Sequence, residues 1–146
     1  MRRPQFLLAV AWVVYIVAWF LPVVRGEATF PETLPGWGAF RVAASALWAF
    51  EGIHTHHAVL CVTSAVTSAV FLPVSVWAAF GGSRRMRLVA WAAAGAFVFN
   101  THWIVIFGSD RGDLRIGYYL WWISFLLLAL ALFALSRAEA PKDAST

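Results

Sequence analysis

Charged residues are scarce in this sequence of 146 residues: only 12% are Asp, Glu, Lys or Arg, whereas 62% are hydrophobic. A soluble domain of this size carries about a quarter of its residues as charged side chains. The mean hydropathy of +0.75 is correspondingly high. This composition excludes an ordinary soluble domain and makes a lipid bilayer the expected solvent.

Cysteine and catalytic motifs are equally sparse. Cys61 is the single cysteine, so the chain can form no internal disulfide and no paired-cysteine redox centre. No Gly-rich phosphate loop, G-x-S-x-G or H-E-x-x-H motif occurs. The net charge of +4 is accompanied by no aromatic-basic motif that would bind nucleic acid. We therefore predict no catalytic residues, no nucleic-acid partner and a protein that is not an enzyme.

What the sequence does have is long apolar runs. Four of them approach or exceed the roughly 18 to 20 residues that cross a bilayer core. We expect membrane-spanning helices at about residues 6–24, 58–80, 88–107 and 116–135. The predicted fold is all-α: a single four-helix transmembrane domain over residues 1–137, with a polar tail at 138–146.

The segment between the first two runs has two parts. Residues 25–38 are rich in proline and glycine, which predicts a loop. Trp37, Phe40 and Trp48 then recur at helical spacing, with Arg41 on another face. This pattern predicts a short interfacial helix at about residues 37–50 in the first outer loop. The alternative is that these residues begin the second spanning helix.

The distribution of basic residues predicts the orientation. One side of the predicted bundle carries seven of them, and the opposite side carries four. The seven are Arg2, Arg3, Arg84, Arg85, Arg87, Arg137 and Lys142, and the four are Arg25, Arg41, Arg111 and Arg115. By the positive-inside rule, both termini lie in the cytoplasm of a multi-pass protein of the bacterial cytoplasmic (inner) membrane.

Small residues suggest how the helices pack. In the second run Ser64 and Ser68 share a helix face, and the third run has Ala92 and Gly95. Such faces let helices approach closely in lipid, so these two runs are the predicted centre of the bundle. The leucine-rich part of the last run is predicted to face lipid. Pro73 is expected to kink the second helix. Asn100, a polar residue within the third run, is expected to form interhelical hydrogen bonds.

Three stretches resemble a loose set of small, uncharacterised bacterial four-helix membrane proteins. They are "WFLPVV" at the end of the first run, "LPGWGAF" in the first outer loop and "GYYLWWISFLLLALALF" in the last run. The resemblance implies four helices and a membrane location. It implies no activity and no catalytic residues.

The stretch "EGIHTHHAVLC", residues 51–61, gathers polar side chains next to a membrane run. Glu51, His54 and His57 are three apart, so on a helix they share a face and form a possible metal site. His102 is predicted to lie near the same membrane surface, where it could be the fourth ligand of this metal site. His57 with His102 is also a possible axial pair for haem, with Phe99, Trp103 and Gly95 lining the flat macrocycle. The competing interpretation is a solvated junction at the membrane edge, with no cofactor.

The favoured hypothesis is a non-enzymatic accessory or assembly subunit without a cofactor. Its partners would be the lipid bilayer and either a larger membrane protein or further copies of itself. One alternative is a small haem- or transition-metal-binding membrane protein that uses the outward-side histidines. A second is an ion-conducting oligomer, for which Ser64, Ser68 and Ser75 are the candidate polar stripe.

Overall fold

The computed structural model describes residues 3–25, 33–48, 55–107 and 113–139, and these are mostly helical (86%). The helices are α1 (Arg3–Phe20), α2 (Gly36–Ser45), α3 (Thr55–Ala79), α4 (Ser83–Asn100), α5 (His102–Phe107) and α6 (Ile116–Glu139). Two short strands, β1 (Pro22–Val24) and β2 (Leu34–Pro35), pair antiparallel. Four helical segments are long and apolar enough to cross a membrane, which agrees with the all-α prediction.

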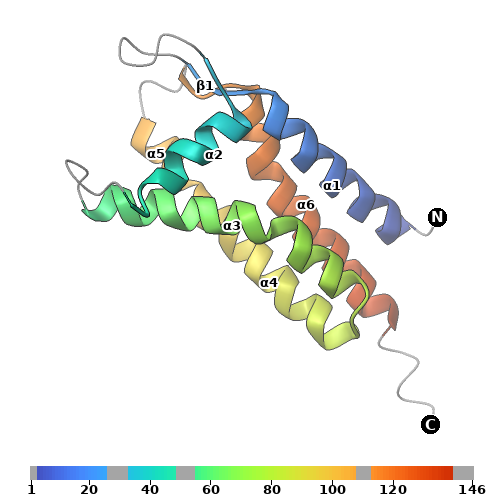
Figure 1. Ribbon diagram of the computed structural model, residues 1–146. Coiled ribbons are helices and arrows are strands. Elements are labelled where there is room, and N and C mark those ends of the chain that lie inside the picture. Colours follow the sequence, from blue (N-terminus) through green and yellow to red (C-terminus); the bar gives the residue numbers. More distant parts are fainter. Residues whose placement is uncertain (1–2, 26–32, 49–54, 108–112, 140–146) are drawn as a thin grey trace.

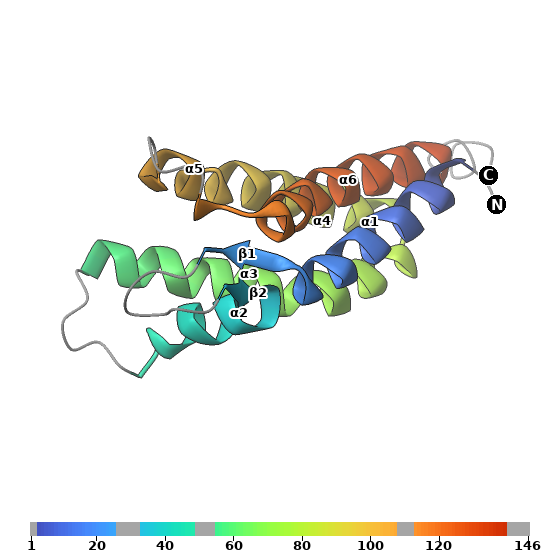
Figure 2. The ribbon, with the colours of Figure 1, turned by 90° about the horizontal axis from the view of Figure 1, so that it is seen from above.

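The four long segments run between two ends of the molecule. Both termini lie at one end, and β1, α2 and α5 lie at the other (Figure 2). The short helix α2 overlaps the range expected for an interfacial helix: it begins one residue earlier, at Gly36, and also ends earlier, at Ser45. The third apolar run is divided at Thr101 into α4 and α5. α3 bends along its length (Figure 1), and it contains Pro73, whose missing N–H weakens the helix ladder.

The last helix, not the second and third, forms the centre of the bundle. α6 packs along α1 on one side and along α4 on the other, whereas α3 approaches α4 and α6 over shorter stretches (Figure 1). Small residues allow this close packing: Ala129 on α6, Ala11 on α1 and Ala90 on α4 are all buried. The prediction that the second and third apolar runs form the centre of the bundle was therefore wrong.

Two details of the packing prediction fail for the same reason. Leu128 and Leu132 of α6 are buried, although that segment was expected to face lipid. Ala92 and Gly95 of α4 are exposed, and a side chain at Gly95 would meet no atom within 4 Å. Helical periodicity identified the small-residue face of α4 but not the direction in which it points.

Main-chain contacts join the segments at the end that carries α2. β1 pairs with β2 and also contacts the segment before α6: Arg25 N–H donates to Asp113 O at 2.7 Å, and Arg115 N–H donates to Val23 O at 2.8 Å. Gly117 lies so close that an added Cβ would be 2.6 Å from Pro22 O. The first turn of α6 is thus fixed against the chain leaving α1.

Candidate functional site

Three buried serines line one face of α3, and each accepts a hydrogen bond from a tryptophan of a different helix. Trp103 of α5 donates its indole N–H to Ser64 Oγ at 3.0 Å. Trp121 of α6 donates to Ser68 Oγ at 3.1 Å. Trp12 of α1 donates to Ser75 Oγ at 2.9 Å. The serine face therefore connects α3 to three other helices.

Each of these hydroxyls also donates a hydrogen bond. Ser64 donates to Asn100 Oδ1 at 2.7 Å, Ser68 to Ser64 O at 2.8 Å and Ser75 to Leu72 O at 2.9 Å. The three serines were the candidate lining of an ion path. Their hydroxyls are instead used in hydrogen bonds within a single copy of the protein. Its polar atoms stabilise helix packing in an apolar interior, where unpaired polar groups are costly.

Asn100, at the end of α4, is fully buried and forms the centre of this polar network. Its amide nitrogen donates to Ala96 O at 2.8 Å and its Oδ1 accepts from Ser64. Its main-chain oxygen accepts from the Tyr118 hydroxyl at 2.7 Å. The interhelical hydrogen bonding expected of a polar residue in an apolar run is observed here.

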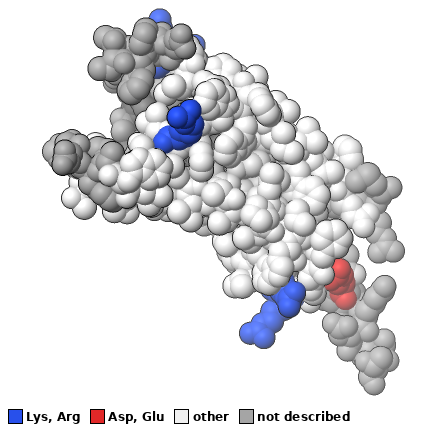
Figure 3. Space-filling view, viewed as in Figure 1, with Lys and Arg blue, Asp and Glu red and all other residues white. Residues whose placement is uncertain are grey.

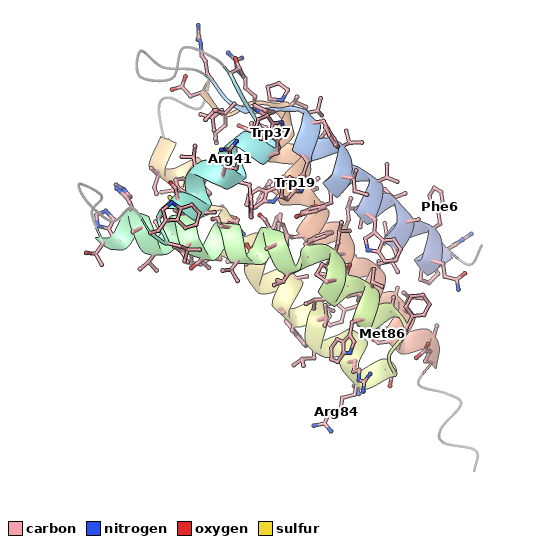
Figure 4. All side chains as sticks on the ribbon, in the orientation of Figure 1. Phe6, Trp19, Trp37, Arg41, Arg84 and Met86 are labelled. Atoms are coloured by element: carbon pink, nitrogen blue, oxygen red, sulfur yellow. The ribbon has the colours of Figure 1, made fainter. Side chains whose placement is uncertain are left out.

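A cavity of about 290 Å³ lies beside the network, where α3 and α6 diverge. α1, α2, α5, β1 and β2 complete its walls. The lining residues include Trp19, Phe40, Ala43, Cys61, Ser64, Ala65, Ser68, Trp103, Leu114, Tyr118, Trp121 and Arg25. Trp19 extends from α1 toward α2, where its ring lies 5.1 Å from that of Phe40 (Figure 4).

The cavity lining is mainly apolar, and its polar side chains are largely satisfied. The hydroxyls of Ser64 and Ser68 and the indoles of Trp103 and Trp121 bond to one another across it. The Tyr118 hydroxyl bonds to Asn100. Arg25, an exposed residue, is the one cationic residue among the described residues that line the cavity. Such a site suits a hydrocarbon ligand better than a polar one.

The predicted histidine site is described only in part. Glu51 and His54 lie outside the described residues. His57 is half-buried near the start of α3, and its ring lies 4.1 Å from that of His56. Within the described part of the chain, no three His, Cys, Asp or Glu side chains are grouped to hold a metal ion. The four-residue metal set and the His57–His102 haem pair therefore stay predictions.

His102 begins α5, where the preceding helix breaks. Its Nδ1 lies 2.7 Å from Phe99 O, a geometry that places a proton on Nδ1 and leaves Nε2 as the acceptor. Nε2 is buried and has no hydrogen-bond partner among the described residues. The ring packs 4.5 Å from Trp103 and 5.1 Å from Phe99. Gly95, once expected to line a flat ligand with these aromatics, faces open space.

The tryptophan donors and the cavity were missed by sequence reasoning. None of Trp12, Trp103 and Trp121 was predicted to donate a buried hydrogen bond, because the indole ring was counted as apolar. Its N–H must nevertheless find an acceptor when buried. Buried serines on a neighbouring run were the available signal, since their hydroxyls can accept such bonds.

No family model, curated protein or solved structure matches this chain. The resemblance to small bacterial four-helix membrane proteins therefore rests on its three sequence stretches alone.

Proposed function

We propose that this protein is a multi-pass integral membrane protein of the bacterial cytoplasmic membrane. It acts as a non-enzymatic accessory or assembly subunit that packs against a larger membrane protein or against its own copies. The observation that carries this proposal is the outer surface of the four long helical segments. Large apolar side chains are exposed along all of them, including Phe6, Trp77, Leu88, Trp91 and Leu130.

Membrane insertion accounts for this surface. Phe6 is 61% exposed and Trp91 is 70% exposed, which would be unfavourable in water at about 25 cal/mol per Å² of apolar surface. The charged side chains visible on one face lie toward its ends, with an uncharged band between them (Figure 3). Both termini share one end (Figure 2), as an even number of spans requires. The excess of basic residues assigns that end to the cytoplasm.

The accessory role is supported by the contrast between the interior and the surface of α4. The interior polar groups are used in structural hydrogen bonds, which leaves few groups for chemistry. On the surface of α4, the small exposed residues Gly95 and Ala92 lie beside the large exposed side chains of Leu88 and Trp91. Small residues permit close approach of another helix backbone in lipid. This surface is the proposed contact with the partner.

Site-specific photo-crosslinking in native membranes tests the role. A photoreactive residue at Val98 of α4, which is 69% exposed, should give one discrete crosslinked product. The same residue at Val66 of α3, which is 48% exposed, is the control and should give none. Mass spectrometry of the product distinguishes a second copy from a different protein. Equal, diffuse products at both positions, or monomer only, would contradict the proposal.

A haem- or metal-binding membrane protein is the second candidate. The observation in its favour is the buried, unpartnered Nε2 of His102, whose Nδ1 is held by Phe99 O. A histidine that binds a metal usually donates its other ring N–H to a carbonyl or carboxylate oxygen in this way. The visible absorption spectrum and metal content of the purified protein test it. A Soret band or near-stoichiometric metal that is lost in His102→Ala or His57→Ala supports this candidate, and a colourless, metal-free protein contradicts it.

A further inference from the structure

We propose that the cavity between α3 and α6 binds one acyl chain of a phospholipid, with the lipid phosphate beside Arg25. The proposal rests on membrane insertion, as argued above, but not on the existence of a protein partner. It assigns to the cavity a ligand class, and to Arg25 the role of contacting the head group.

The size and chemistry of the cavity favour a hydrocarbon chain. Its volume of about 290 Å³ lies just below the range of roughly 300–1,000 Å³ found for small-molecule pockets, so it suits a narrow ligand such as one chain. Its apolar contacts come from Phe40, Ala43 and Ala65, among others. Each buried methylene contributes about 0.8 kcal/mol when it leaves water. An acyl chain that leaves the bilayer core gains less free energy than one that leaves water, because it is already in an apolar solvent. It still fills a space whose walls would otherwise lack dispersion contacts.

The polar atoms in the wall disfavour water and polar ligands. Ser64 and Ser68 each donate one hydrogen bond and accept another from an indole. A water molecule in a buried site needs two to four polar partners. These hydroxyls are already engaged, so the deep wall presents mainly carbon.

The same hydrogen bonds keep the cavity open. Trp121 extends from α6 to Ser68 of α3, and Trp103 extends from α5 to Ser64 of α3. The indole rings thus separate the helix backbones where small side chains line α3. On the other side, the ring of Phe40 on α2 packs against Trp19 of α1. Aromatic side chains held by these contacts therefore form part of the cavity wall.

Arg25 fits the head-group end of such a ligand. Arg25 is an exposed residue and is one of the residues that line the cavity. Its main chain is fixed by the hydrogen bond from its N–H to Asp113 O. In the proposed orientation it lies at the outer membrane surface, at the level of lipid phosphates. A guanidinium binds a phosphate through two parallel hydrogen bonds.

Native mass spectrometry of the full chain in detergent provides the first test. Dioleoylphosphatidylglycerol and dioleoylglycerol, which has the same acyl chains but no phosphate, are titrated separately. We expect one saturable phospholipid adduct with an affinity about tenfold above that of dioleoylglycerol. Arg25→Gln should remove that difference and leave weak binding of both lipids. Arg84→Gln, at the other end of the molecule, is the control and should retain the difference.

Filling the cavity provides the second test. Ala65→Phe on α3 should abolish the adduct, and Ala43→Leu on α2 should weaken it at least tenfold. If Ala65→Phe prevents folding, the smaller substitution Ala43→Leu still tests whether the cavity binds the lipid. Ala69→Leu, on the exposed face of α3, is the matched control and should bind as the wild type does.

Cys61 offers a readout inside the cavity, since it lines the wall and is the only cysteine. Dioleoylphosphatidylglycerol should slow its reaction with N-ethylmaleimide at least fivefold. A cysteine placed at Ala69 in a Cys61→Ala background should show no protection. An unsaturable adduct, or lipid binding that survives both cavity-filling substitutions, would overturn the proposal. Neither result bears on the photo-crosslinking at Val98, so the two proposals fail separately.

Discussion

The hydroxyl of Tyr118 on α6 donates a 2.7 Å hydrogen bond to the main-chain oxygen of Asn100 on α4. In an uninterrupted helix that oxygen would accept from the N–H of residue 104. Here the Ile104 N–H donates to Thr101 O instead, because the helix breaks between α4 and α5. Tyr118 therefore satisfies a carbonyl that the break leaves without its helical partner.

Tyr118→Phe should destabilise the protein by about 1–2 kcal/mol, because a buried carbonyl loses its partner. Reversible unfolding of the detergent-solubilised protein in a titration with a denaturing detergent measures the change. Tyr119→Phe, at the adjacent half-buried position, should change the free energy of unfolding by less than about 0.5 kcal/mol. Equal effects of the two substitutions would show that the hydrogen bond contributes little.

Ser75→Ala should cost about 0.5–1.5 kcal/mol, because the indole N–H of Trp12 would lose its acceptor in an apolar setting. Thr63→Ala is the control on the same helix, since its exposed hydroxyl bonds only to Val59 O of its own helix. In the double mutant Trp12→Phe/Ser75→Ala, the two losses should be less than additive. The same unfolding titration gives all of these values, and strict additivity would argue against the pair.

Gly117→Ala should destabilise the fold by about 1–3 kcal/mol, because the new methyl would lie 2.6 Å from Pro22 O, a main-chain atom that cannot rotate away. Gly36→Ala should behave similarly, with the methyl 2.5 Å from Ala18 O. Gly95→Ala has open space and should be neutral or slightly stabilising, because alanine favours helix. Thermal unfolding of the three variants in one detergent compares them directly. The prediction would be wrong if Gly95→Ala destabilised the protein and the other two substitutions did not.

Replacing Arg84, Arg85 and Arg87 together by Gln should produce mixed orientations. It reduces the basic residues on the proposed cytoplasmic side from seven to four, equal to the other side. Reporters fused to the C-terminus, one active outside the membrane and one inside, measure the proportion. Arg137→Gln alone leaves six and should keep a single orientation. A wild-type C-terminus found outside the cytoplasm would reject the proposed topology.

The sequence was sufficient to predict the number and type of the long helices, because apolar length is a local property. The packing order was not local. Leu128 of α6 and Val98 of α4 look alike in a hydropathy profile, yet the first is buried and the second is 69% exposed. In lipid the outside of a bundle is as apolar as its inside, so composition does not separate the two faces.

The candidate site, like the fold, was predictable only in part from the sequence. Ser64, Ser68 and Asn100 were recognised as polar residues within apolar runs, and hydrogen bonding was anticipated for Asn100. Their tryptophan partners come from other helices, at sequence separations such as the 53 residues between Ser68 and Trp121. The cavity depends on the spacing that these indoles impose. No single segment of the sequence encodes it.

The position of α6 between α1 and α4 has a consequence for synthesis. Membrane helices enter the bilayer one by one and associate afterwards. α1 emerges from the ribosome before α2, α3, α4 and α5, but α6, the helix it packs along, emerges after all of them. Until then α1 and α4 both lack their main neighbour, and the chain before α6 has no central helix. In the proposed membrane protein, assembly of the bundle therefore waits for α6, and a nascent chain stalled before residue 116 would expose both faces to chaperones and membrane proteases.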